Sequence, residues 1–472
     1  MKDLADNPLC HMLGCSRPIV LAGMGGVARS ELVAAVAAAG GFGFLGMVRE
    51  SPELIAAEVG RLRRLGIDRF GVNIIPAATG SDLLARQVET LLALRVPAVT
   101  LFWDIDTRLV RRLREAGILV VYQVGSVAEA VDAERAGAQV IIAQGCEAGG
   151  HVRGATPLQS LLPAVAGAVQ VPVLAAGGLS TGGDLIAALS LGAEGIVLGT
   201  ALLAAEESFA HDHHKHRLLA AKAGDTLLTE TFHINWPHGA RVRVLASAVT
   251  AGKRGREVEG ERVVIGDEDG RPIYLFSTDS PLRSTTGDLE SMALYAGTGV
   301  GMIHAIRSAR AILDGIVAEA EQLIASTCTS PDDAAEASSS VCYAGEMGGT
   351  YMGMMDAAAA GDEAAKLAGA LAAVLAQRPP RDANAPPFSS EALDLSPRLL
   401  ALTLLAGGRQ ARTLSPPMQP DVSPADLSGR IGLLSARVPE GALRTALVSL
   451  RSALERTVWP DAGTALRQTA ET

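Results

Sequence analysis

The sequence predicts an α/β protein built on a closed (β/α)8 TIM barrel, with an α+β cap insertion and a C-terminal, mainly helical extension. Three observations support this prediction. Eight short apolar runs, rich in β-branched residues, recur between residues 18 and 198. Hydrophobicity within each run is continuous, as in strands buried on both faces. Amphipathic segments of helical periodicity separate the runs, so that strand and helix alternate along the chain.

The elements follow one another in a regular order. The predicted strands are Pro18–Ala22, Gly41–Leu45, Phe70–Ile75, Ala98–Phe102, Ile118–Val121, Gln139–Ala143, Val171–Ala175 and Glu194–Leu198. The predicted helices are Ser30–Ala39, Pro52–Leu65, Thr107–Ala116, Ser126–Ala136 and Gly183–Leu191. Eight such units are typical of a closed parallel barrel.

Local signals support these helix boundaries. Ser51 is placed to cap the N-terminus of the second helix. Glycine follows several helices just before the next strand, a common C-terminal cap, at Gly40, Gly66, Gly117, Gly137 and Gly192. An open, doubly wound sheet is the alternative fold. It usually has a GxGxxG loop after its first strand, which the sequence Gly23–Gly26 matches only in part.

The pattern changes after the eighth run. Residues 1–204 are predicted to form the barrel and residues 205–290 the cap, with β-like stretches at Ala240–Val249 and Glu261–Phe276. A turn at Asp267–Gly270 predicts a hairpin within the second stretch. Residues 291–326 are predicted to return to the barrel as its terminal helix. Residues 327–472, rich in Ala, Ser and Pro, are predicted to be an accessory helical extension of unknown role.

Composition excludes several classes of protein. The net charge is −10 with both signs interspersed, so no nucleic-acid partner is expected. The five cysteines form no CxxC, which favours a reducing compartment over a disulfide framework. No secretory signal is apparent, and prolines break the uncharged stretch Gly154–Gly183 into a helix and a strand. We therefore expect a soluble, cytoplasmic protein without a membrane partner.

The last two strands end in sequences suited to binding phosphate. Ala176, Gly177 and Gly178 follow the seventh strand, and Gly199 and Thr200 follow the eighth. In such barrels the loops after strands seven and eight often bind phosphate, and glycine lets backbone N–H groups approach an anion. No lysine or arginine is adjacent in sequence, so we expect backbone N–H groups and the Thr200 hydroxyl to bind the phosphate. The alternative is that these glycines only form tight turns.

The sixth strand leads into the sequence Gln144–His151, which is rich in glycine and ends in histidine. A histidine at the mouth of the barrel is suited to act as a general base, because its pKa lies near neutral pH. The alternative is a surface-loop histidine without a role in catalysis. Cys146 is a less favoured nucleophile, because no separate base is paired with it.

Other strand ends supply further candidates. Asn73 and Gln123 could hydrogen-bond a cofactor through their amides, and Met24 could form a wall of the site. Asn at a strand end also often caps the following helix, which is the alternative for Asn73. The histidines at 211–216 do not share one helix face, so a solvated helix start is expected there and no metal site.

Four motifs of the sequence together resemble the nitronate monooxygenase family. They are Gln144–His151, Ala175–Gly178, Gly199–Thr200 and Leu294–Val300, in order and with natural spacing within residues 11–326. The resemblance implies an FMN cofactor and the oxidation of alkyl nitronates, in some members neutral nitroalkanes, by O2 to a carbonyl compound and nitrite. It implies His151 as the active-site histidine. The predicted cofactor-binding residues are Met24, Asn73, Gln123, Gly150, Ala176, Gly177, Gly178, Gly199 and Thr200.

The resemblance has two departures and leaves two alternatives. Thr298 stands where many members have glutamine, and residues 327–472 fall outside it. The first alternative is an FMN-dependent NAD(P)H reductase acting on quinones or an enoyl thioester. The second is a flavin-bound scaffold whose residues 327–472 bind a protein partner. The sequence also leaves a homo-oligomer open.

Overall fold

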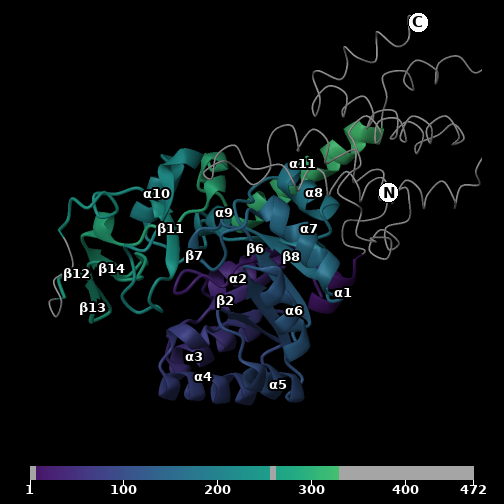
Figure 1. Ribbon diagram of the computed structural model, residues 1–472, viewed down its shortest axis with the longest axis horizontal. Coiled ribbons are helices and arrows are strands. Elements are labelled where there is room, and N and C mark those ends of the chain that lie inside the picture. The colour runs from purple at the N-terminus through teal and green to yellow at the C-terminus, as the bar shows by residue number, and fades with distance from the viewer. Residues whose placement is uncertain (1–6, 256–261, 329–472) are drawn as a thin grey trace, which may run out of the picture. The chain divides into compact units, whose positions relative to one another are not determined.

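The computed structural model describes residues 7–255 and 262–328. Eight parallel strands close into a barrel in the order β1-β2-β3-β4-β5-β6-β8-β9 (Figure 1). This confirms the predicted (β/α)8 barrel, and each observed strand overlaps one predicted apolar run. The strands are β1 (Ile19–Leu21), β2 (Phe42–Gly46), β3 (Gly71–Asn73), β4 (Ala98–Phe102), β5 (Leu119–Val124), β6 (Val140–Gln144), β8 (Val173–Ala176) and β9 (Gly195–Leu198).

The barrel interior is filled with apolar side chains. Val20, Phe42, Val121 and Leu174 belong to one buried cluster, together with Leu9 of α1 (Pro8–Leu13). The Leu9 N–H donates to Glu194 Oε2 at 3.1 Å, immediately before β9. The helix α1 therefore packs against the N-terminal end of the barrel.

The predicted helices and caps are confirmed. The barrel connections contain α2 (Ser30–Ala38), α3 (Pro52–Arg64), α5 (Thr107–Glu115), α6 (Val127–Ala136) and α7 (Leu158–Ala168), and the structure adds α4 (Ser81–Ala93) and the short η1 (Pro76–Ala78). Ser51 Oγ accepts the Leu54 N–H at 3.2 Å, which caps α3. The glycines after α3 and α6 adopt left-handed φ values of +74° and +111°, which favour glycine over other residues.

The cap contains two small sheets, which lie beside the barrel (Figure 1). One has the order β10-β11-β7 and the other β13-β12-β14. Gly270 N–H donates to Asp267 Oδ1 at 2.8 Å, which confirms the predicted hairpin turn. The strands are β7 (Gly150–Val152), β10 (Thr226–Thr229), β11 (Arg241–Leu245), β12 (Val264–Glu268), β13 (Arg271–Tyr274) and β14 (Thr285–Gly287). The short helices are α9 (Thr200–Leu203), α10 (Asp212–Leu219), η2 (Ala223–Asp225), η3 (Leu289–Ser291) and η4 (Thr298–Met302).

The chain divides into two compact units. The first contains the described residues up to 181 and from 192 to 317, which include all barrel strands and the cap. The described part of the second unit is α8 (Gly182–Ser190), Leu191 and the end of α11 (Ala309–Cys328). There Glu319 accepts the N–H groups of Gly182 and Gly183 at 2.9 and 3.3 Å. The predicted divisions at residues 204, 290 and 326 stay predictions, and residues 329–472 lie outside the described structure.

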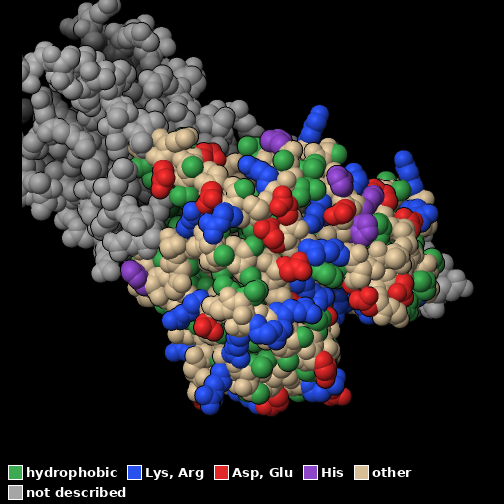
Figure 2. All heavy atoms as spheres, turned by 180° about the vertical axis from the view of Figure 1, so that it is seen from behind, with side chains coloured by type: hydrophobic (Ala, Val, Ile, Leu, Met, Phe, Trp, Pro, Cys, Tyr) green, Lys and Arg blue, Asp and Glu red, His purple; other side chains and the backbone are tan. Residues whose placement is uncertain are grey.

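The described surface carries mixed charge. Figure 2 shows Lys and Arg side chains interspersed with Asp and Glu side chains on one face, without a continuous band of one sign. None of the described helices combines the length and apolar character needed to cross a membrane.

Candidate active site

A cavity of about 700 Å³ lies at the C-terminal ends of the barrel strands, with further walls from the cap. Phe44, Ile142 and Val197 of the barrel core line it. The structure brings all ten predicted site residues to this one cavity. They are Met24, Asn73, Gln123, Gly150, His151, Ala176, Gly177, Gly178, Gly199 and Thr200. Their individual roles toward a cofactor stay predictions.

The two glycine loops leave space suited to an anion. Gly177 and Gly178 have φ values of +120° and +73°, which L side chains rarely adopt. A Cβ atom at Gly199 would meet nothing nearer than the Met24 sulfur, at 3.9 Å. Thr200 Oγ1 accepts the Gly297 N–H at 2.9 Å, so its own hydroxyl proton remains for another acceptor. These loops fit a phosphate bound by backbone groups and one hydroxyl.

Asn73 offers a buried acceptor to the same cavity. Its Nδ2 donates to the Thr100 carbonyl at 3.3 Å, which fixes the amide orientation. Its Oδ1 is buried and has no partner among the described residues. A buried polar atom without a partner is costly, so a ligand N–H is the natural partner. This is the contact that a flavin ring would supply.

His151 lies on a strand, whereas the sequence analysis placed it in a loop. It is the middle residue of β7 and pairs with Val242 of β11. The side chain of Gln144 holds this strand through two hydrogen bonds. Its Nε2 donates to the His151 carbonyl at 2.8 Å, and its Oε1 accepts the Arg153 N–H at 3.2 Å. The imidazole stacks on Trp236, with ring centroids 3.3 Å apart and an interplanar angle of 16°.

The environment of His151 keeps its ring neutral. Burial lowers the pKa of His151 well below its usual value, and the positive charge of Arg49 lowers it further. Its Nε2 atom is buried without a partner in the described structure. A neutral imidazole with one unoccupied nitrogen is the form that can accept a proton.

The comparisons identify the family. Residues 6–319 match the family model described as nitronate monooxygenase. The chain belongs to the nitronate monooxygenase family. It is therefore a flavin-dependent oxidoreductase, which confirms the resemblance drawn from the four motifs.

Proteins that are similar to this chain differ in their names. The chain is 31% identical over 345 residues to the (3aS,4S,5R,7aS)-5-hydroxy-7a-methyl-1-oxo-octahydro-1H-indene-4-carboxyl-CoA dehydrogenase of Mycobacterium tuberculosis (strain ATCC 25618 / H37Rv), covering 66% of this chain and 96% of the relative. It is similar in structure to FabK from Thermotoga maritima (28% identity, TM-score 0.56, 67% and 97% covered). It is also similar to the nitroalkane oxidase of Streptomyces ansochromogenes (30% identity, TM-score 0.55, 67% and 98% covered).

Two residues considered in the sequence analysis do not line this cavity. Cys146 is buried outside the cavity lining, and burial raises its pKa to about 11, which disfavours a thiolate nucleophile. Thr298 is fully buried and does not line the cavity.

The expectation of a solvated histidine cluster is wrong for His214, which is fully buried. Its Nε2 lies 3.0 Å from the Tyr295 carbonyl, and burial lowers its pKa to about 4. His213 pairs with Glu290. No group of three metal-binding side chains occurs in the described part of the chain.

Sequence reasoning missed many residues that line the cavity, and four of them carry polar or aromatic groups suited to a ligand. Arg49, Trp236, Arg271 and Tyr295 contribute side chains to its walls. Arg49 lies three residues after β2, so a longer scan past each strand end would have found it. Trp236 and Arg271 come from the cap and Tyr295 from the segment that follows it, and the contacts of these parts with the barrel have no fixed spacing in sequence. The cavity thus contains cationic side chains, although none is adjacent in sequence to the glycine loops.

Proposed function

We propose that the chain catalyses FMN-dependent oxidation of alkyl nitronates, and of neutral nitroalkanes, by O2 to a carbonyl compound and nitrite. One observation carries this proposal. His151 lines the cavity that the two glycine loops also line, and its Nε2 has no partner among the described residues. Small-molecule substrate, cofactor and base can therefore meet in one space.

The residues of the cavity divide the work of binding. Gly177, Gly178, Gly199 and Thr200 would hold the FMN phosphate, and Asn73 Oδ1 would accept an N–H of the flavin ring. Bound FMN would supply the redox chemistry. Gln123, on β5, is placed for a further amide contact. Release of the bound flavin by heat, followed by chromatography against FMN and FAD standards, identifies which flavin the protein carries.

His151 would act only on neutral substrates. Its Nε2 would take the α-proton of a nitroalkane, so that the C–H bond breaks and its electron pair enters the nitro group to give the nitronate. The Trp236 ring stacked on the imidazole would favour the resulting imidazolium through a cation–π contact. A nitronate is already deprotonated and would not need this step.

The substitution His151→Asn tests this assignment. We expect kcat/KM on nitroethane to fall by about 100-fold or more, within the usual contribution of general-base catalysis. Turnover of ethyl nitronate should fall by less than about tenfold, because the base is bypassed. Nitrite release and O2 uptake measure both. Equal losses on the two substrates would remove His151 as the base.

A second candidate is an FMN-dependent NAD(P)H reductase acting on a quinone or an enoyl thioester. The specific support is that a carboxyl-CoA dehydrogenase and FabK match about as well as the nitroalkane oxidase does. Anaerobic mixing of the flavin-loaded protein with NADH or NADPH separates the two. Flavin bleaching faster than nitronate turnover would favour the reductase, and slow or absent bleaching favours the nitronate reaction.

A further inference from the structure

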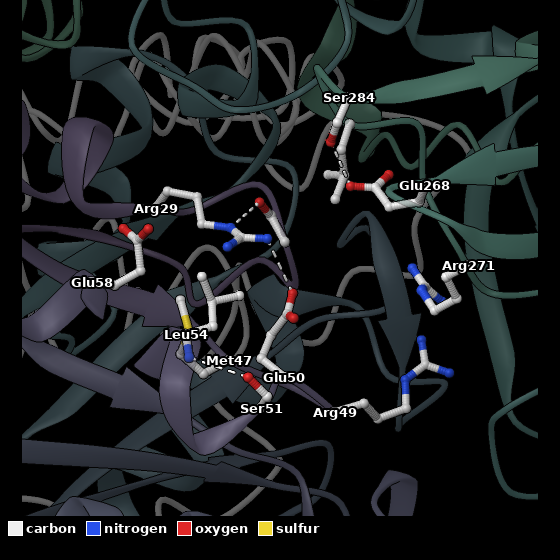
Figure 3. Close-up of polar contacts among 12 residues, drawn as sticks. Arg29, Met47, Arg49, Glu50, Ser51, Leu54, Glu58, Glu268, Arg271 and Ser284 are labelled. Atoms are coloured by element: carbon white, nitrogen blue, oxygen red, sulfur yellow. Dashed lines mark hydrogen bonds and ion pairs between the residues drawn. The ribbon is translucent and has the colours of Figure 1, made fainter. Parts of the chain in front are cut away.

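Two arginines meet at the cap-facing wall of the cavity. Arg49 follows β2 of the barrel, and Arg271 begins β13 of the cap. Asp279 Oδ1 lies 3.4 Å from Arg49 Nη2 and 3.0 Å from Arg271 Nη1. One buried carboxylate thus holds two guanidinium groups together, and Figure 3 shows them facing each other.

The neighbouring carboxylates are engaged elsewhere. Glu50 pairs with Arg29 at 3.3 Å, as Figure 3 shows. Glu268 accepts hydrogen bonds from the hydroxyls of Ser284 and Thr285. Asp279 is thus the only carboxylate within ion-pair distance of Arg49 and Arg271 in the described structure, while Glu50 and Glu268 attract Arg271 over a longer range.

The two guanidinium groups have donor capacity left. Among the described residues, Arg49 makes only long contacts, with Asp279 at 3.4 Å and with the Asn235 carbonyl at 3.5 Å. Each guanidinium carries five N–H donors in a planar fork. The Arg271 side chain is 54% exposed and that of Arg49 28%, and both line the cavity, so a ligand can reach them.

The backbone directs Arg49 toward this wall. Arg49 and Asn235 both have left-handed φ values, +60° and +74°, although neither is glycine. Such strain persists where the surrounding structure enforces it, and it is frequent at ligand-binding positions. Asn235 precedes Trp236, which stacks on His151. The arginine pair is therefore next to the wall that carries the proposed base.

We propose that Arg49 and Arg271 bind an oxyanion of the substrate, a carboxylate or a phosphate, other than the reacting group. The inference rests on the proposed function in placing that carbon beside His151. Planar guanidinium forks bind both kinds of oxyanion in bidentate fashion. A simple alkyl nitronate has one anionic group, which is the reacting one. The site therefore indicates a larger substrate with a second anionic group, bound across barrel and cap.

Calorimetric titration of the flavin-loaded full chain tests this site. The probes are inorganic phosphate, coenzyme A and glutarate, and the variants are Arg49→Met and Arg271→Met. Arg112→Met is the control, because Arg112 lies on the outer helix α5 and pairs with Glu89. We expect one probe to bind once per chain, at least tenfold more weakly in the two test variants and unchanged in the control.

The preferred probe identifies the oxyanion. Tighter binding of phosphate or coenzyme A indicates a phosphate-bearing substrate, and tighter binding of glutarate indicates a dicarboxylate-like one. The proposal is overturned if no probe binds, or if both test variants bind as the unchanged protein does. If Arg271→Met does not retain flavin, Arg271→Lys replaces it, because lysine keeps the positive charge but lacks the planar guanidinium. We expect Arg271→Lys to bind the probe several-fold more weakly than the unchanged protein does.

Nitrite release from ethyl nitronate is measured on the same unchanged protein. Anion binding without nitrite release would refute the proposed nitronate reaction and leave the anion site in place. Nitrite release without anion binding would refute only the anion site.

Discussion

At the scale of single residues, the site depends on polar atoms that the protein itself leaves without partners. His151 Nε2, Asn73 Oδ1 and Trp236 Nε1 are all buried and unpartnered among the described residues, and all three residues line the cavity. Native proteins rarely leave such atoms unsatisfied, because each costs desolvation free energy. Their concentration in one cavity supports a bound polar ligand there more strongly than any single residue does.

Glu147 makes the loop before His151 sensitive to pH. Its carboxylate is 4% exposed, and both oxygens accept the Leu158 N–H at the start of α7, at 3.0 and 3.2 Å. Burial of Glu147 is the main reason that its pKa is raised from 4.5 to about 7. The hydrogen bonds to its carboxylate and the positive charge of Arg243 lower the pKa, but they offset only part of this rise. The proton is therefore held more tightly by the folded than by the unfolded chain.

The substitution Glu147→Gln should remove a pH dependence of stability. Below pH 4.5 the carboxyl is protonated in both states. Between pH 4.5 and about 7 only the folded state keeps the proton, so the free energy of unfolding falls as the pH rises, by up to about 3 kcal/mol, and then levels off. Urea unfolding at pH 5 and pH 8 measures this fall.

The matched control is Glu115→Gln, at an exposed position on the outer helix α5. It should show the same fall with pH as the unchanged protein. A fall of the same size in Glu147→Gln would show that other groups cause it.

At the scale of elements, the position of His151 depends on how β7 is held. This three-residue strand belongs to the cap sheet, although it lies in sequence between β6 and β8 of the barrel. It pairs with β11 along one edge. On its other side the buried Gln144 bonds the His151 carbonyl and the Arg153 N–H. One side chain at the end of a barrel strand thus sets the orientation of a cap strand.

The substitution Gln144→Leu should displace His151 while leaving the barrel closed. Two backbone groups of β7 would lose their partners, at a cost of about 1–3 kcal/mol each where they stay buried. We expect kcat on nitroethane to fall by roughly tenfold to 100-fold, because small displacements of a catalytic group are costly. Steady-state nitrite assays and thermal unfolding measure the two effects.

The control is Gln170→Leu, at an exposed position between α7 and β8. It should change neither quantity appreciably. Unchanged turnover in Gln144→Leu would show that β11 alone is sufficient to orient the histidine.

The same element shows what sequence can and cannot predict. The barrel strands were predictable because burial on both faces requires continuous apolar runs such as Ala98–Phe102, which is β4 itself. The glycine loops were predictable because their strand ends are fixed by the fold. The strand β7 was not predictable from its sequence, Gly-His-Val. It is a strand because it pairs with residues 241–243 of β11, about ninety residues later in the chain.

At the scale of the whole molecule, the chain is longer than its relatives. The family match ends at residue 319, and relatives that are covered over 95–98% of their length account for only 66–67% of this chain. All described residues that line the cavity lie between 22 and 299. The described lining of the cavity therefore lies within the part of the chain that the family model matches.

We therefore expect a chain of residues 1–328 to retain flavin and nitronate turnover within about twofold of the full chain. A chain of residues 1–308 is the matched control. It removes the start of α11, whose buried Leu313 and Ile316 belong to the first unit, so it should lose stability by several kcal/mol and with it the flavin. Flavin absorbance per chain and nitrite release measure both.

If residues 1–328 lose the flavin as completely as residues 1–308, the extension takes part in cofactor binding and the scaffold alternative regains support. Retention by residues 1–328 alone would assign the extension a role outside the chemistry, such as binding a protein partner.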